Sequence, residues 1–143
     1  MFDLTVLTLE KPFFNGSVYS VIIPGADGYF QILSNHAPLI SLVQPGVVEI
    51  EQREGNKEIF AISGGFFEIS HNKATLIADA FEKASDIDYQ RAVISLENAQ
   101  ARLNSGENQV DIERARLAVK RAKNRIKIYQ QTHLQTHLQT GSI

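Results

Sequence analysis

Seven basic side chains crowd residues 114–127 and form the most informative chemical feature of the sequence. Glu113 is the only acidic residue beside them. On a helix, like charges four residues apart repel each other by a few tenths of a kcal/mol per pair. That cost favours an acidic partner or a phosphate ligand over a merely solvated helix face. The members of this basic stripe are Arg114, Arg116, Lys120, Arg121, Lys123, Arg125 and Lys127.

Histidine supplies the next candidate chemistry. His36 lies in the polar loop 34–38, where a general base is one possible use for it. No motif places a Ser, Asp or Cys partner beside it, so a role in shaping the loop or in an interface is favoured. His133 and His137 are spaced i, i+4, which suits a metal ion if that segment is helical. We interpret them as part of a solvated Thr-His-Leu-Gln repeat and assign no metal site.

The other signals for catalysis are weak. Ser63-Gly64-Gly65 lacks the Gly-Lys-Ser/Thr ending of a phosphate-binding loop, so a bulge or a sharp strand turn is predicted there. The chain has no Cys, which excludes disulfides, thiolate metal sites and a Cys nucleophile. No paired-carboxylate signature is found. The residues therefore predict a binding scaffold and not an enzyme.

Composition places the chain among soluble globular proteins. Its 143 residues are 43% hydrophobic and 21% charged, enough for one ordinary domain or two small ones. The net charge of −2 argues against bulk nucleic-acid binding. The apolar runs are too short to cross a bilayer, and the N-terminus lacks the features of an export signal. We expect a cytosolic protein, or one attached to something on the cytosolic side.

Charge and hydrophobic periodicity both change near residue 84. Residues 1–84 hold five basic and ten acidic groups, a net charge of −5. Residues 85–143 hold nine basic and six acidic groups, a net charge of +3. The asymmetry predicts an α+β protein in two parts, with the boundary after residue 84.

The first part reads as strands. Eight or nine short β-branched or alternating segments are separated by turn signals roughly every ten residues. Pro24-Gly25, Asp27-Gly28 and Pro45-Gly46 are examples of these signals. Residues 1–84 are therefore predicted to form an antiparallel β-sandwich or barrel.

The second part reads as two helices over residues 85–129. The first begins with acidic residues near Asp88, and it ends at Asn104-Ser105-Gly106. Alanine recurs in the apolar stripes of both helices, which allows their axes to approach closely. The short connection predicts an antiparallel hairpin. The tail 130–143 is predicted to be disordered.

Five segments together resemble the epsilon subunit of bacterial-type or chloroplast-type rotary F-type ATP synthases. They are residues 24–40, 62–69, 75–79, 87–92 and 114–126. The segment 87–92 is similar to the I/L-D-x-x-R-A motif that opens this family's helical hairpin. The resemblance covers about residues 1–129, in order, and includes both expected parts.

The resemblance implies a non-catalytic rotor component in the central stalk of a proton-translocating ATP synthase. Its sandwich would pack on the gamma subunit and the c-ring, with Tyr29 and His36 at these contacts. Its hairpin, with the basic stripe, would inhibit ATP hydrolysis when extended into the alpha/beta catalytic head. The chain would meet the membrane only through the complex, at the cytoplasmic face of the bacterial membrane or the stromal face of the thylakoid.

The resemblance also implies a regulatory ligand, although no cofactor is required. Some bacterial members bind ATP with the hairpin folded. The matching residues here are Glu82, Ile87, Asp88, Arg91, Arg121 and Arg125. Asn98 stands where the ATP-binding pattern has an Arg. The alternative is that Asp88 and Arg91 only cap and brace the first helix.

Two other functions stay open from the residues alone. The first is a stand-alone β-sandwich adaptor or ligand-binding module with a basic helical arm. The second, a small hydrolase using His36, is weaker. Co-elution with a gamma subunit separates a rotor component from a free adaptor.

Overall fold

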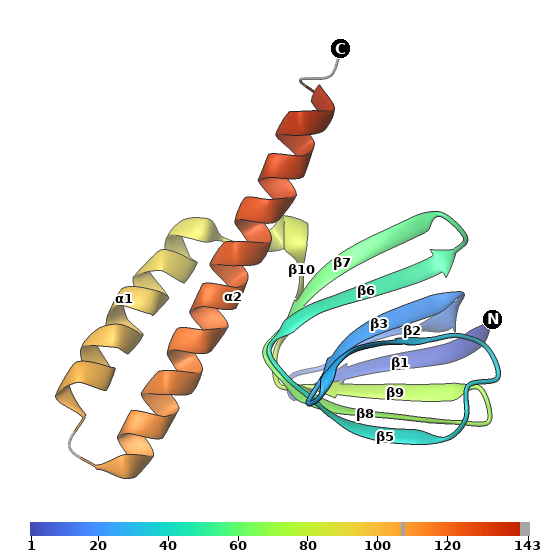
Figure 1. Ribbon diagram of the computed structural model, residues 1–143, viewed down its shortest axis with the longest axis horizontal. Coiled ribbons are helices and arrows are strands. Elements are labelled where there is room, and N and C mark those ends of the chain that lie inside the picture. The colour runs from blue at the N-terminus through green and yellow to red at the C-terminus, as the bar shows by residue number, and fades with distance from the viewer. Residues whose placement is uncertain (107, 141–143) are drawn as a thin grey trace. The chain divides into compact units, whose positions relative to one another are not determined.

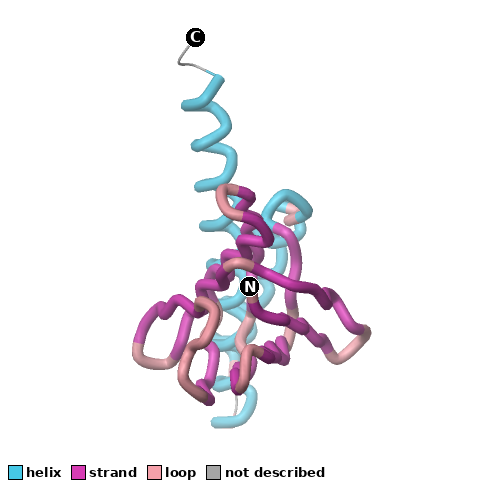
Figure 2. The backbone as a smooth tube through the Cα atoms, turned by 90° about the vertical axis from the view of Figure 1, so that its right-hand side faces the viewer, coloured by secondary structure: helices cyan, strands magenta, loops and turns pink. Residues whose placement is uncertain are grey.

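The computed structural model describes residues 1–106 and 108–140, with side chains described as far as residue 133. The chain divides into two units, Met1–Lys83 and Ala84–Ile143. Strands make up the first unit and helices the second, as the colouring in Figure 2 shows. The expected fold class, a β-sandwich or near-barrel followed by a helical hairpin, is confirmed.

The first unit contains ten strands within the described residues (Figure 1). They are β1 (Phe2–Thr8), β2 (Pro12–Val18), β3 (Ser20–Gly25), β4 (Gly28–Ile32), β5 (Leu39–Val43), β6 (Gly46–Arg53), β7 (Asn56–Ile62), β8 (Gly65–Ser70), β9 (Lys73–Ala78) and β10 (Phe81–Lys83). Their order is β10-β7-β6-β3-β5-β8-β9-β1-β2, with β4 paired to β3. Sequence patterns missed β2, which begins with Pro12 and contains Asn15-Gly16, and the three-residue β10.

The described strand pairs are antiparallel except for one. β1 runs parallel to β9, with Leu4 opposite Ala74 and Val6 opposite Leu76. These four side chains are buried in one core with inward-facing residues of the other strands. Inward and outward residues alternate along β1, as the period of two in a strand requires.

The predicted sharp turn at Ser63-Gly64-Gly65 is confirmed. Gly64 has a φ of 122°, a conformation that favours glycine. A Cβ atom at Gly65 would clash with the carbonyl oxygen of Ile77. The carbonyl oxygen of Gly64 accepts a hydrogen bond of 2.9 Å from the backbone N–H of Asp79. The two glycines thus end β7 and let β8 begin against β9.

The second unit consists of η1 (Ala84–Asp86), α1 (Tyr89–Ser105) and α2 (Gln109–Thr140). α1 and α2 pack against each other, and η1 packs against α2. The side chain of Asp88 caps α1 by accepting a hydrogen bond from the N–H of Arg91. The expected alanine interface is present, since buried alanines come from both helices. They are Ala92, Ala99, Ala115 and Ala122.

The helix α2 continues through residues 130–140, which were expected from the sequence to belong to a disordered tail. The difference has a local cause, because residues 108–140 contain neither Gly nor Pro to end the helix. Thr132 also donates its hydroxyl to the carbonyl oxygen of Ile128 at 2.9 Å, a bond that a helical backbone accommodates. Within the described ranges, no helix is both long enough and apolar enough to span a membrane.

Candidate functional site

The outer face of the sheet carries an apolar row that crosses four neighbouring strands. Leu42 of β5 lies opposite Phe66 of β8, which lies opposite Ile77 of β9. Ile77 in turn lies opposite Leu7 of β1. Leu42 is 66% exposed and Ile77 is 46% exposed, whereas Phe66 and Leu7 are half-buried. These four residues are called the apolar row.

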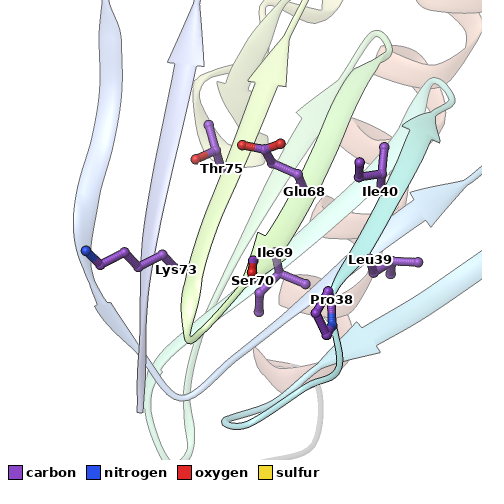
Figure 3. Close-up of a pocket in the computed structure, with 8 residues that line it drawn as sticks. All are labelled: Pro38, Leu39, Ile40, Glu68, Ile69, Ser70, Lys73 and Thr75. Atoms are coloured by element: carbon purple, nitrogen blue, oxygen red, sulfur yellow. The ribbon is translucent and has the colours of Figure 1, made fainter.

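A second row beside it mixes apolar and polar side chains. Ile40, Glu68 and Thr75 follow one another across β5, β8 and β9 (Figure 3). They line an open pocket together with residues at the ends of the same strands. Ile40 is 68% exposed and places a further apolar side chain next to Leu42 of the apolar row on the same face of β5. Exposed apolar residues gathered in one patch are typical of a surface that binds another protein.

Sequence reasoning missed the apolar row, although the sequence contains a signal for it. Each of the four strands carries two adjacent apolar residues: Val6-Leu7, Leu42-Val43, Phe66-Phe67 and Leu76-Ile77. Adjacent side chains in a strand point to opposite faces, so only one of each pair can enter the core. The core takes Val6, Val43, Phe67 and Leu76. The other member of each pair must face outward.

Tyr29, an expected interface residue, lies on β4 and is 59% exposed. Its hydroxyl accepts a hydrogen bond of 3.0 Å from the backbone N–H of Val47. The same oxygen lies over Gly46, where an added Cβ atom would come within 2.8 Å of it. Tyr29 therefore joins β4 to the start of β6 while part of its side chain stays accessible.

His36, the other expected interface residue, belongs to a loop of fixed shape. Its Nδ1–H donates to the carbonyl oxygen of Ala37 at 2.7 Å. The adjacent Asn35 has a φ of 63° and accepts a hydrogen bond of 3.0 Å from the amide of Asn72. The backbone N–H of Asn35 donates to the Oδ1 atom of Asn72 at 2.6 Å. This reciprocal pair ties the loop to the turn between β8 and β9.

The basic stripe lies along α2, where five of its seven side chains are exposed. Arg121 and Arg125 are half-buried. Glu113, the acidic residue beside the stripe, accepts a hydrogen bond from Gln109 one turn earlier. The exposed cations are therefore available to an external acidic surface. They are Arg114, Arg116, Lys120, Lys123 and Lys127.

The residues expected to bind ATP differ in their burial, their hydrogen bonds and the unit to which they belong. Asp88 uses its Oδ1 atom to cap α1, at 3.1 Å from the backbone nitrogen of Arg91. Ile87 is buried. The Nε atom of Arg121 is buried and has no hydrogen-bond partner among the described residues. Glu82 belongs to β10 of the first unit, whereas the other five residues belong to the second.

Two residues of the hairpin bring its helices together at the start of α1. Tyr89 stacks on Tyr129 with ring centroids 5.0 Å apart. Because the helices are antiparallel, this pairing puts Arg91 and Arg125 in neighbouring turns of α1 and α2. The side chain of His133 is also described, whereas that of His137 lies outside the described residues. The Nδ1–H of His133 donates to the carbonyl oxygen of Tyr129 at 3.0 Å.

Comparison with protein families matches both units. Residues 1–84 match the ATP synthase Delta/Epsilon chain beta-sandwich domain, and residues 85–130 match the Delta/Epsilon chain long alpha-helix domain. The chain belongs to the ATP synthase delta/epsilon chain family. The resemblance drawn from residues 24–40 and the four other segments is thereby confirmed.

Individual relatives agree with the family assignment. The chain is 50% identical to the ATP synthase epsilon chain of Protochlamydia amoebophila over 135 residues, which cover 94% of this chain and 92% of the relative. It is 39% identical to the ATP synthase epsilon chain of Desulforamulus reducens over 125 residues, covering 87% and 93%. These relatives are thus similar along nearly their whole length.

Solved structures show the same fold. One similar chain belongs to the Euglena gracilis mitochondrial ATP synthase, with a TM-score of 0.72 and 20% identity over 92% of this chain and 79% of that one. Another belongs to the central stalk and c-ring structure of the Tetrahymena thermophila enzyme, with a TM-score of 0.64 and 11% identity over 89% and 95%. The α2 helix of this family member extends past residue 130, where the match to the family model ends.

Proposed function

We propose that this chain is an epsilon subunit of an F-type ATP synthase and works as a non-catalytic part of the central-stalk rotor. The observation that carries the proposal is the apolar row on a sandwich of this family. Its outward side chains leave apolar surface in water, and burial against another subunit would be favourable by roughly 25 cal/mol per Å². A stand-alone adaptor is disfavoured because the named relatives are ATP synthase subunits that match along nearly their whole length.

The gamma subunit and the c-ring are the partners of this proposal. The apolar row, together with Tyr29 and His36, would form the contacts that fix the sandwich to the rotor. A sandwich with a continuous core and a clasped loop at Asn35 and Asn72 is suited to transmit torque, because it resists deformation. The complex would hold the chain peripherally at the cytoplasmic face of a bacterial membrane, or at the stromal face of the thylakoid in a plastid.

Docking through the apolar row is tested by charge insertion. Leu42→Asp and Ile77→Asp should abolish co-elution with gamma while the free chain stays folded. Leu9→Asp is the matched control, because Leu9 is 87% exposed and lies outside the row. Unchanged gamma binding by both row variants would contradict the docking role. Equal loss in the Leu9 control would show a nonspecific effect of charge.

The hairpin is proposed to inhibit ATP hydrolysis. The support is its separate fold, its alanine interface and the exposed cations of α2, which suit an acidic surface on the alpha/beta head. An interface of small side chains buries little area per residue, so a second surface can replace it. Packed and extended hairpins would then be two states of one switch.

Inhibition is tested by deleting residues 85–143, after the end of the match to the beta-sandwich domain. The remaining sandwich should still bind gamma, and ATP hydrolysis by the complex should rise. Charge is tested separately by changing Lys120, Lys123 and Lys127 to Gln, with Arg102→Gln on α1 as control. Hydrolysis that stays the same after the deletion would contradict the inhibitory role.

We also propose that ATP is a regulatory ligand of the packed hairpin. The specific support is the buried Nε atom of Arg121, which lacks a partner among the described residues. Arg91 and Arg125 lie in neighbouring turns, and guanidinium groups suit phosphate oxygens. Ile87 and Asp88 complete the set that the second unit supplies, and Glu82 of β10 is the expected residue outside this unit.

Calorimetry of the full chain with Mg-ATP tests the nucleotide proposal. Binding heat should be lost in Arg91→Ala and Arg125→Ala. Absence of heat at millimolar nucleotide, or equal binding by both variants, would leave only the capping role of Asp88. Lys123→Ala serves as a control for the loss of one exposed cation from the same helix.

A further inference from the structure

Three aromatic rings stack at the open end of the helical hairpin. Tyr129 of α2 stacks on Tyr89 of α1, with ring centroids 5.0 Å apart and planes inclined by 24°. His133, one turn farther along α2, stacks on Tyr129 at 3.8 Å with planes inclined by 29°. The Nδ1–H of His133 also donates to the carbonyl oxygen of Tyr129. These three residues are called the ring stack.

The ring stack lies at the end of the hairpin opposite the connection between the helices, where it can affect their separation. The helices are tied by the short connection after Ser105 at one end, whereas α1 begins at Tyr89 at the other. Between these ends, the buried contacts of the hairpin are made largely by alanines, which contribute little apolar area. A two-helix hairpin opens most easily at the end without a loop. Ile87 and Ile128 are buried near that end and η1 packs against α2, and the contact between large rings adds to them in opposing separation of the helices.

The third ring comes from the part of α2 beyond the match to the family's helical domain. That match ends at residue 130, whereas α2 continues to Thr140. His133 reaches Tyr129 because residues four apart lie on the same helix face. The His133 ring stacks on the Tyr129 ring, whereas its hydrogen bond goes to the backbone carbonyl of Tyr129 and not to the ring. The helical extension thus contacts Tyr129, which in turn contacts α1 through Tyr89.

We propose that the ring stack is a latch that holds the hairpin in its packed state, with His133 as a positioning residue. The latch is a property of the chain itself and needs neither nucleotide nor another subunit. Its consequence for ATP hydrolysis rests on the proposed function, because a latch that favours the packed hairpin disfavours the extended, inhibitory one. Loss of the latch would then strengthen inhibition.

Hydrogen exchange of the full, isolated chain tests the latch directly. The amides of residues 92–96 in α1 report opening of the hairpin, since exchange of protected amides follows local opening. His133→Ala should raise their exchange rates roughly two- to tenfold, the factor expected for one aromatic pair. Alanine is a better helix former than histidine, so faster exchange would not be explained by weaker helix propensity.

Two matched variants separate stacking from other effects. His133→Phe keeps a ring and should exchange close to the parent rate, although it lacks the Nδ1–H donor. Gln130→Ala, at an exposed position of the same turn, should also exchange at the parent rate. Tyr129→Leu removes both ring pairs and should give the fastest exchange of the set, with helix content checked by circular dichroism.

The outcomes decide the proposal. Faster exchange in His133→Ala with recovery in His133→Phe supports the latch. Equal rates in His133→Ala and Gln130→Ala would overturn it, and so would His133→Phe exchanging as fast as His133→Ala. The measurement uses no ATP synthase complex, so its result is independent of whether deletion of the hairpin raises ATP hydrolysis.

Discussion

The two units of the chain are stabilised by different kinds of contact. The sandwich buries Phe, Leu, Ile and Val side chains in one core, through strand pairs between residues far apart in the sequence. The hairpin buries mainly alanines, with Ile87 and Ile128 as larger members. Separating large apolar side chains costs much free energy because a large apolar area becomes exposed, whereas separating alanines costs little. The contrast is that expected between a rigid body that binds and an arm that can change its packing.

The largest expected effect breaks the sandwich. Phe67 is fully buried in the core, so Phe67→Ala should lower the free energy of unfolding of this unit by about 3–5 kcal/mol. The hairpin counterpart Ala99→Gly should cost only about 1 kcal/mol, because it removes one methyl group and adds backbone freedom. Urea unfolding followed by probes in each unit measures both. If the two variants lowered the free energy of unfolding by similar amounts, the two units would not differ in how strongly their contacts stabilise them.

The next prediction concerns the outward partner of the same pair of phenylalanines. Phe66→Ser should change the free energy of unfolding by much less than Phe67→Ala, because Phe66 is only half-buried. It should instead weaken gamma binding by about 2 kcal/mol or more, roughly thirtyfold, if it lies centrally in the interface. Titration with purified gamma measures this change. If Phe66→Ser lowered the free energy of unfolding as much as Phe67→Ala does and left gamma binding unchanged, Phe66 would belong to the core and not to the binding surface.

A smaller effect is expected at the start of the hairpin. Asp88→Ala removes the α1 cap and should destabilise this helix by about 1 kcal/mol, whereas Asp88→Asn should retain most of the stability. Hydrogen exchange measured without nucleotide should rise in α1 and stay constant in the strands. A simultaneous rise in β1 and β9 would mean that the two units open together.

The smallest effect sharpens the role of Tyr29. Tyr29→Phe removes the acceptor of the backbone N–H of Val47 and should cost the sandwich about 0.5 kcal/mol, because water can replace the acceptor at this exposed position. Tyr19→Phe, at another exposed tyrosine, should be neutral. Equal midpoints of urea unfolding for Tyr29→Phe and the parent would assign Tyr29 to the interface alone.

The more disruptive Tyr29→Asp and His36→Asp should weaken coupling of proton flow to ATP synthesis.

Local sequence patterns determine much of this protein. The turn at Gly64-Gly65, the cap at Asp88 and the alanine stripes depend on neighbouring residues, so the two-part organisation and the hairpin are readable without a structure. The family is also readable, because its motifs are short and contiguous. The strand β2 could not be predicted because Pro12 and Asn15-Gly16 are residues typical of loops. The strand β10 could not be predicted because its three residues are too few to show a periodicity.

Only the tertiary structure decides which distant residues become neighbours. The apolar row joins residues 7, 42, 66 and 77, and it depends on the parallel pairing of β1 with β9, which no local pattern specifies. The ring stack likewise joins Tyr89 to Tyr129 across the hairpin. The sequence shows that each of these four strands has two adjacent apolar residues, of which only one can face the core. The register of the sheet gathers these residues into one surface, because pairing between strands is set by the packing of the whole unit.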